Sequence, residues 1–190
     1  MAEERTRMLK LHLGCGETIL EGWVNIDKYD PRADVKADIC YLPYEDNSVD
    51  EIAAYQVIEH LPYWKTSLIS NGMNLNLEPE FFMECYRVLK PGATMITECP
   101  DMEWIAKRIV ESGDIDYKST VNMYGEYFRP WDKSRYEDWE HFAGALHITA
   151  FTWKKIQKIA HFCGFAKIER RPMLEKHDKY EENLSVLWTK

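Results

Sequence analysis

The stretch Met8-Leu-Lys-Leu-His-Leu-Gly14-Cys-Gly16-Glu17 decides the fold, because it predicts a short apolar strand that runs directly into a turn with two glycines. Glycine has no Cβ, so a ligand can approach the backbone closely, and positive φ angles carry no steric cost. A second predicted strand, Trp23–Ile26, is followed at once by Asp27. A strand, a glycine turn and an acid after the next strand are typical of an adenosine site, where the carboxylate accepts hydrogen bonds from the ribose.

The glycine pattern does not favour a dinucleotide. Such a site requires G-x-G-x-x-G, a helix N-terminus for the pyrophosphate, and an acid about 20 residues further on. Here Ile19 occupies the third glycine position, and Asp27 follows Gly14 too closely for a full crossover helix. A nicotinamide-dependent enzyme is therefore disfavoured.

The chain resembles the class I S-adenosylmethionine-dependent methyltransferases through five short motifs, which follow the family's order over roughly the first hundred residues. The motifs are Leu11–Gly16, Gly22–Asp27, Ala37–Pro43, Val57-Ile-Glu-His60-Leu and Tyr86–Gly92. The short link between the first two is similar to that of a compact branch of predicted methyltransferases, some of them associated with glycan synthesis. The resemblance implies S-adenosylmethionine as the cofactor.

Predicted strands alternate with helices along most of the chain, which indicates an α/β fold with a parallel sheet. The predicted strands are Met8–Leu13, Trp23–Ile26, Val35–Ala37, Asp50–Val57, Ala93–Glu98, Ala166–Arg171 and Leu184–Thr189. The predicted helices are Pro79–Lys90, Met102–Glu111 and one that starts after the N-cap Thr152 and is closed by Gly164. No helix separates the last two strands, so they predict a terminal hairpin. The family resemblance implies a Rossmann-like, doubly wound, mostly parallel seven-stranded sheet with an antiparallel C-terminal strand.

Ligands of open α/β sheets bind beyond the carboxyl ends of the strands. This rule selects, among others, Gly14, Cys15, Gly16 and Gln56. The resemblance assigns Gly14 and Gly16 to the methionine part of the cofactor. It assigns Asp27 to the ribose, and Asp38 with the Ile39 backbone to the adenine edge. The alternative for Asp27 is an ordinary turn aspartate.

Two departures from the family concern the glycine turn. His12 replaces the acid that is common just before the turn, and no third glycine follows Gly16. His12 is better explained as a strand histidine with a satisfied hydrogen bond than as a ligand.

Three residues are candidate catalytic bases. His60 follows the fourth predicted strand and has the intrinsic pKa for proton transfer, although a structural histidine bound to a loop carbonyl explains it equally well. Asp101 follows the fifth predicted strand and could equally be a helix N-cap. His147 begins a His…Phe-Thr…Gly-Phe run that resembles tails of related methyltransferases, where the histidine faces the pocket.

An aromatic-rich segment at about residues 113–147 is the candidate lid over the acceptor. Aromatic faces suit a sugar or ring substrate and favour a cationic methyl donor. The same residues could instead extend the core or form a dimer interface. Within this segment, residues 124–142 contain seven aromatic residues and one histidine: Tyr124, Tyr127, Phe128, Trp131, Tyr136, Trp139, His141 and Phe142.

Composition excludes several classes of protein. The formal net charge of −8 argues against a surface that binds DNA or RNA. The five cysteines are scattered, with neither a C-x-x-C pair nor a His/Cys ligand spacing, so we expect reduced thiols, no disulfide and no metal site. The N-terminus has no apolar signal region and no stretch is long enough to span a membrane, so we expect a soluble, cytoplasmic protein. Its 190 residues predict one domain.

We therefore expect methyl transfer from S-adenosylmethionine to a hydroxyl or amine of a small molecule or glycan. Two alternatives stay open: a non-catalytic S-adenosylmethionine-binding protein, and a methyltransferase acting on nucleic acid or protein. The sequence does not decide between a monomer and a homodimer.

Overall fold

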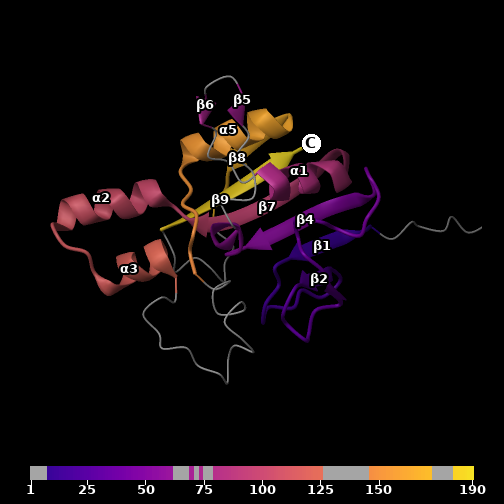
Figure 1. Cartoon of the computed structure of the whole chain (residues 1–190), viewed down its shortest axis with the longest axis horizontal. Helices are drawn as coiled ribbons and strands as arrows, with labels where there is room; N and C mark the ends of the chain where they lie inside the picture. Colours follow the sequence, from indigo (N-terminus) through magenta and orange to yellow (C-terminus); the bar gives the residue numbers. More distant parts are fainter. Residues whose placement is uncertain (1–7, 62–68, 71–72, 75–78, 126–145, 173–181) are drawn as a thin grey trace, which may run out of the picture.

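A seven-stranded sheet forms the centre of the protein (Figure 1). The computed structural model describes residues 8–61, 69–70, 73–74, 79–125, 146–172 and 182–190. The strands of the large sheet are β1 (Lys10–Leu13), β2 (Val24–Asp27), β3 (Val35–Lys36), β4 (Val49–Tyr55), β7 (Leu89–Pro100), β8 (Lys167–Arg170) and β9 (Asn183–Thr189). A separate two-stranded pair comprises β5 (Ile69–Ser70) and β6 (Met73–Asn74). The helices are η1 (Ile58–His60, 3₁₀), α1 (Pro79–Val88), α2 (Met102–Ser112), α3 (Tyr117–Tyr124) and α5 (Trp153–Cys163).

The strand order is β3-β2-β1-β4-β7-β9-β8. All neighbouring pairs are parallel except those of β9, which is antiparallel to both β7 and β8. The expected mostly parallel seven-stranded sheet with an antiparallel last strand is confirmed. The strand order reverses between β1 and β4, and ligands of open α/β sheets bind at such a switch point, beyond the carboxyl ends of the strands.

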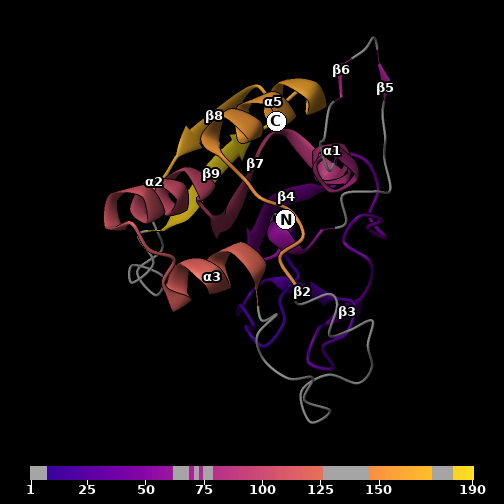
Figure 2. The same cartoon turned by 60° about the vertical axis from the view of Figure 1, so that its left-hand side comes forward.

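The core lies between this sheet and two helices. Figures 1 and 2 show α1 and α5 next to each other over the same face, where they contact one another. Trp188 of β9 is fully buried there, with ring centroids 5.0 Å from Phe82 of α1 and 5.1 Å from Phe165. Its indole Nε1 donates to Thr97 Oγ1 at 2.9 Å, so the one polar atom of the largest core side chain is satisfied.

All five cysteines are free thiols; Cys15, Cys85 and Cys99 are buried. None of the helices in the described ranges is long and apolar enough to cross a membrane.

The first predicted helix and the strand after it have different boundaries from those expected. The helix ends at Val88 rather than Lys90, and β7 begins at Leu89 rather than Ala93 and passes through Pro91-Gly92, a dipeptide that usually ends a helix. Leu89 pairs with Val49 of β4. The last carbonyls of the helix accept hydrogen bonds from elsewhere in the chain, including Lys190 Nζ to Tyr86 O at 2.6 Å. Tertiary partners therefore end the helix earlier than the local residues predict.

Two further elements differ from the expectation. β4 ends at Tyr55 rather than Val57, because Gln56 has a φ of +53° and turns the chain away from the sheet. Helix α3 was not predicted. It is capped by Asp116, whose side chain accepts from Ser119 N, but its 8 residues are too few for a periodicity to be recognised.

We predict that Trp188→Phe lowers the free energy of unfolding by about 1–3 kcal/mol, because the Thr97 hydroxyl loses its partner in a site that is 1% exposed. Adding Thr97→Val should recover part of this loss, since both members of the polar pair are then replaced by apolar groups. Urea denaturation measures both values. If the double variant loses more free energy of unfolding than the two single variants lose together, this account of the core is contradicted.

Candidate functional site

The glycine turn after β1 packs directly against the chain that leaves β4. Gly14 has a φ of +63°, and a Cβ at this position would lie 2.0 Å from Val57 Cγ2. A side chain is therefore excluded by steric overlap as well as by backbone conformation. The turn and the end of β4 meet at the switch point of the sheet.

Asp27 connects the same turn to β2. Its Oδ2 accepts from Gly16 N at 2.9 Å, and its Oδ1 accepts from Tyr29 N at 2.8 Å and Asp30 N at 3.0 Å. A Cβ on Gly16 would meet no atom within 4 Å, so open space lies beside the turn. Cys15, between the two glycines, is buried, and its N donates to Ile26 O at 3.1 Å. Burial, and then the nearby Asp27 carboxylate, raise the pKa of the Cys15 thiol to about 11, so it stays protonated.

A buried polar network holds the short link between the turn and β2. His12 Nδ1 lies 3.1 Å from Asn25 Oδ1, and an amide oxygen only accepts, so the imidazole donates. Asn25 Oδ1 also accepts from Leu20 N at 2.8 Å, and Asn25 Nδ2 donates to Asp34 Oδ2 at 3.0 Å. Hydrogen bonds from Asn25 lower the pKa of the Asp34 carboxyl. The expectation of a strand histidine with a satisfied hydrogen bond is confirmed for His12.

Asp38 and Ile39 lie next along this edge of the sheet. Ala37 N donates to Asp27 O at 3.3 Å, which places the chain after β3 beside the end of β2. Asp38 Oδ1 accepts from Cys40 N at 3.0 Å and therefore holds a tight turn. Both Asp38 and Ile39 are half-buried. The contact at Ala37 thus puts Asp38 and Ile39 at the same edge of the sheet as Asp27.

Gln56 lies in a strained conformation at the end of β4. It is one of two non-glycine residues with positive φ among those described, and its N donates to Glu98 O at 2.8 Å. Its side-chain Nε2 is buried and has no hydrogen-bond partner in the described part of the chain. Backbone strain and an unsatisfied donor tend to occur at ligand sites, where a bound group can satisfy them.

His60 and His147 meet beyond the end of β4, with ring centroids 4.8 Å apart. His60 Nδ1 lies 3.0 Å from Leu146 O, and His147 Nδ1 lies 2.9 Å from Asn122 O. A carbonyl only accepts, so each ring donates from Nδ1, and a neutral ring then has its lone pair on Nε2. His60 therefore bonds to a loop carbonyl, as the structural alternative for this residue predicted. The same bond orients the ring for a structural or a catalytic role.

Glu59 is the residue of this site to which the sequence assigned no role. Its carboxyl group is buried at 1% exposure, and neither oxygen has a hydrogen-bond partner among the described residues. Oε1 lies 4.0 Å from His147 Nε2. Burial raises the pKa of the Glu59 carboxyl to about 8 and lowers the pKa of the His147 imidazole, so near neutral pH the contact joins two mostly uncharged groups. The sequence signal that could have identified Glu59 is the position of an acid between the apolar residues of Val57–Leu61.

Asp101 is the N-cap of α2, the alternative considered for it. Its Oδ1 accepts from Glu103 N at 2.9 Å, and its Oδ2 lies 4.0 Å from Arg170 Nη1. Both oxygens therefore have structural partners, which makes Asp101 a weaker base candidate than the two histidines.

The described residues include the two ends of the predicted lid, 113–125 and 146–147. Residues 113–125 include α3, which is held by an ion pair between Lys118 and the buried Glu182 at 2.8 Å. Gly125 and Leu146 form an antiparallel bridge, so the two ends of the intervening segment meet. Tyr124 is 52% exposed. The aromatic residues between 126 and 145, and His141, lie outside the described residues.

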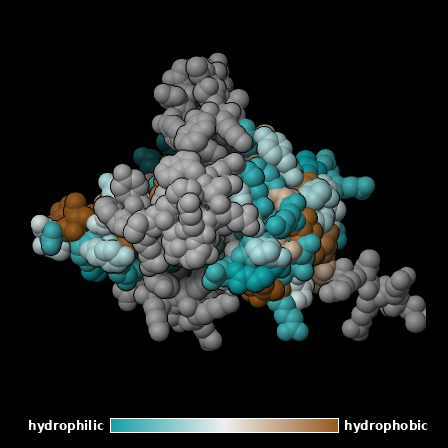
Figure 3. Space-filling model, turned by 60° about the horizontal axis from the view of Figure 1, so that its bottom comes forward, coloured by the Kyte–Doolittle hydropathy of each residue, from teal (hydrophilic) through white to brown (hydrophobic). Residues whose placement is uncertain are grey.

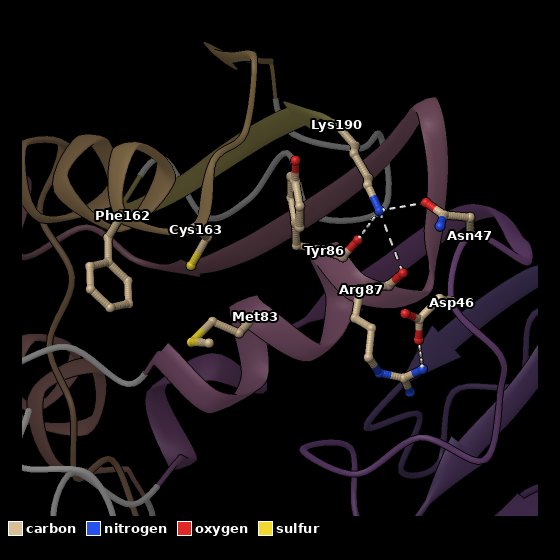
Figure 4. Close-up of a pocket in the computed structure, with 8 residues that line it drawn as sticks. All are labelled: Asp46, Asn47, Met83, Tyr86, Arg87, Phe162, Cys163 and Lys190. Atoms are coloured by element: carbon tan, nitrogen blue, oxygen red, sulfur yellow. Dashed lines mark hydrogen bonds and ion pairs between the residues drawn. The ribbon is translucent and has the colours of Figure 1, made fainter.

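A separate hollow between α1 and α5 lies away from the strand ends (Figure 4). It is lined by Asn47, which precedes β4 and so lies at the opposite edge of the sheet. Its polar groups satisfy one another: Lys190 Nζ donates to Asn47 Oδ1 at 2.8 Å and to Tyr86 O. On the face that Figure 3 shows, the described surface is mostly hydrophilic. Because the polar groups of the hollow already have partners, the strand ends are the better candidate site.

We predict that Gly14→Ala destabilises the protein by about 2–4 kcal/mol, the sum of a steric overlap with Val57 and a left-handed backbone. Gly16→Ala is the matched control, because it has a similar φ of +47° but open space around the new methyl group. Val57→Ala should rescue part of the Gly14→Ala loss. Thermal unfolding compares the variants, and equal losses at the two glycines would show that Val57 does not restrict the turn.

Comparison with known proteins agrees with this arrangement. A model of the methyltransferase domain matches residues 21–97, which extend from just before β2 into β7. A protein of Mycolicibacterium smegmatis described as a probable S-adenosylmethionine-dependent methyltransferase is 35% identical over 72 residues, which are 37% of this chain and 23% of that protein. The chain therefore spans less than a quarter of that relative.

Solved structures share the fold along nearly the whole chain. A methyltransferase of Archaeoglobus fulgidus superposes with a TM-score of 0.56 at 15% identity, covering 97% of this chain and 87% of its own. A methyltransferase of Mesorhizobium loti superposes with a TM-score of 0.52 at 13% identity, covering 96% of this chain and 91% of its own. Over residues 21–97 the chain is therefore similar to the methyltransferase domain, and its overall fold is similar to that of these solved structures.

Proposed function

We propose that this protein transfers the methyl group of S-adenosylmethionine to a hydroxyl or amine of a small-molecule or glycan acceptor. One observation carries the proposal: two oriented imidazoles lie beyond β4, at the same edge of the sheet as the glycine turn and Asp27. A cofactor held by the turn would extend along this edge toward the two rings.

The residues at the strand ends fit the cofactor. Gly14, Cys15 and Gly16 would line its methionine part, because the backbone there is bare and open space lies beside Gly16. The Asp27 oxygens, already oriented by backbone N–H groups, would accept from the ribose hydroxyls. The remaining assignments are Asp38 and the Ile39 backbone at the adenine edge, and the unsatisfied Nε2 of Gln56 as a donor to the cofactor.

The chemistry asks little of the protein beyond position. The bound cofactor supplies a methyl group whose carbon–sulfur bond breaks as the acceptor's oxygen or nitrogen bonds to that carbon, leaving S-adenosylhomocysteine. The protein must align the acceptor with this bond. A hydroxyl acceptor must also lose its proton, and Nε2 of His60 or His147 is suited to take it. Asp101 is the remaining candidate, but its oxygens serve α2 and Arg170.

Charge and aromatic content support the acceptor class. A net charge of −8 disfavours a polyanionic acceptor, and the aromatic residues between 113 and 147 suit a sugar or ring. We retain this segment as the proposed lid of a single domain. The acceptor enters beside it in this proposal.

We predict micromolar binding of S-adenosylhomocysteine by calorimetric titration, and at least a tenfold loss of affinity in Asp27→Ala. One hydrogen bond to a charged group contributes about 1.5–3 kcal/mol, and Asp27 would provide two while also holding the turn. Asp30→Ala is the control, because that neighbouring carboxylate is engaged with Arg32. Equal affinity in Asp27→Ala and wild type, or preferred binding of a nicotinamide dinucleotide, would refute this cofactor site.

We predict that turnover, measured as S-adenosylhomocysteine release, appears with sugars, phenols or small amines rather than with RNA or protein. Replacing the base by alanine, at His60 or His147, should slow turnover by about 10²–10⁴-fold without weakening cofactor binding. Asp101→Asn should have a smaller effect. Cofactor binding without turnover on any of these classes would support the non-catalytic alternative, and turnover on RNA alone would replace the acceptor assignment.

A further inference from the structure

We propose that Glu59, His60 and His147 together bind a divalent transition-metal ion. One ligand atom from each residue lies within 4.8 Å of the others. Two imidazole nitrogens and one carboxylate oxygen form a ligand set that suits Zn²⁺ or Fe²⁺. The sequence led us to expect no metal site, because His147 is far along the chain from the Glu59-His60 pair and no ligand spacing is visible.

The carboxyl group of Glu59 is an independent indication of a cation. It is 1% exposed, and neither of its oxygens has a hydrogen-bond partner in the described ranges. Burying such a group without a partner is costly, and buried carboxylates are normally paired or bound to a metal. Its Oε1 lies 4.0 Å from His147 Nε2, so the unsatisfied oxygen faces the lone pair of that imidazole.

The two histidines already have the outer contacts that metal-binding histidines show. Each ring donates from Nδ1 to a backbone carbonyl, Leu146 O for His60 and Asn122 O for His147. Such bonds fix the tautomer with the lone pair on Nε2 and orient the ring toward an ion. Ile148 N donates to Glu59 O at 3.0 Å, so the two parts of the ligand set are joined through the backbone as well.

The spacing needs only a small contraction on binding. Bonds of about 2.1 Å in a tetrahedral ion place the ligand atoms about 3.4 Å apart. The contact of 4.0 Å between Glu59 and His147, and the limit of 4.8 Å for the group, therefore require closure by roughly an ångström. Side-chain rotation can supply this.

Three protein ligands leave a coordination position open, as in catalytic metal sites. Metal binding itself does not depend on the function proposed above. A role of the metal ion in methyl transfer does rest on that proposed function. An acceptor hydroxyl bound at the open position would lose its proton to solvent more readily and attack the methyl carbon as a metal-bound alkoxide. His60 and His147 would then act as ligands rather than bases.

The test is a calorimetric titration of Zn²⁺ into chelator-treated full-length protein, with Co²⁺ as an optical probe. We expect one ion per chain, a visible Co²⁺ absorption, and a Zn²⁺ affinity about 100-fold lower in Glu59→Gln and in His147→Ala. Two controls should bind as wild type: Glu84→Gln, which changes a partly buried carboxylate of α1 outside the cluster, and His161→Ala, which removes an exposed imidazole of α5.

Zn²⁺ should also raise the unfolding temperature of the wild type and of both controls, but not of Glu59→Gln or His147→Ala. Thermal unfolding shows at the same time whether each variant is folded, and His60→Ala provides a third variant if one is not. Unchanged affinity in folded Glu59→Gln and His147→Ala, or an equal loss in the controls, would overturn the proposal. Titration of the wild type with S-adenosylhomocysteine separates the two proposals. If the wild type binds Zn²⁺ but does not bind S-adenosylhomocysteine, only the proposed function is contradicted.

Discussion

The close approach of Gly14 to Val57 is the constraint on which the site depends. A Cβ on Gly14 would lie 2.0 Å from Val57, so the ends of β1 and β4 can meet only through a bare backbone. That approach directs the chain leaving β4 through the strained Gln56 and into the turn of 3₁₀ helix that carries Glu59 and His60. The cofactor side and the acceptor side of the proposed site are therefore joined by one steric contact.

The acceptor side is built from chain segments that only tertiary structure brings together. Residues 146–149 are bound to η1 by backbone hydrogen bonds to Glu59 O and by the Thr149 hydroxyl, which donates to Leu61 O at 3.1 Å. His147 reaches back to the C-terminal end of α3 through Asn122 O. The geometry of the two imidazoles therefore depends on α3 as well as on the sheet, and α3 is itself anchored to the buried Glu182.

Local patterns predicted most of the fold and supplied the residues that we propose for the cofactor side of the site. Strands with continuous apolar runs, the Thr152 and Gly164 caps of α5, and the acid at the end of β2 are all signalled by residues close in sequence. The start of β7 was misplaced because its first residue pairs with Val49 of β4, a contact that overrides Pro91-Gly92. The cluster around Glu59 could not be predicted, since it depends on the distant His147 and on burial, and a ligand-spacing rule detects neither.

A crystal structure with S-adenosylhomocysteine would test the central claim most directly. The account predicts ribose hydroxyls on the Asp27 carboxylate, the methionine part against Gly14 and Gly16, and the sulfur directed toward His60 and His147. A ligand bound at another edge of the sheet, such as the hollow beside Lys190, would contradict it. A ligand at the glycine turn whose sulfur points away from the two imidazoles would leave the cofactor site in place and remove the acceptor site proposed here.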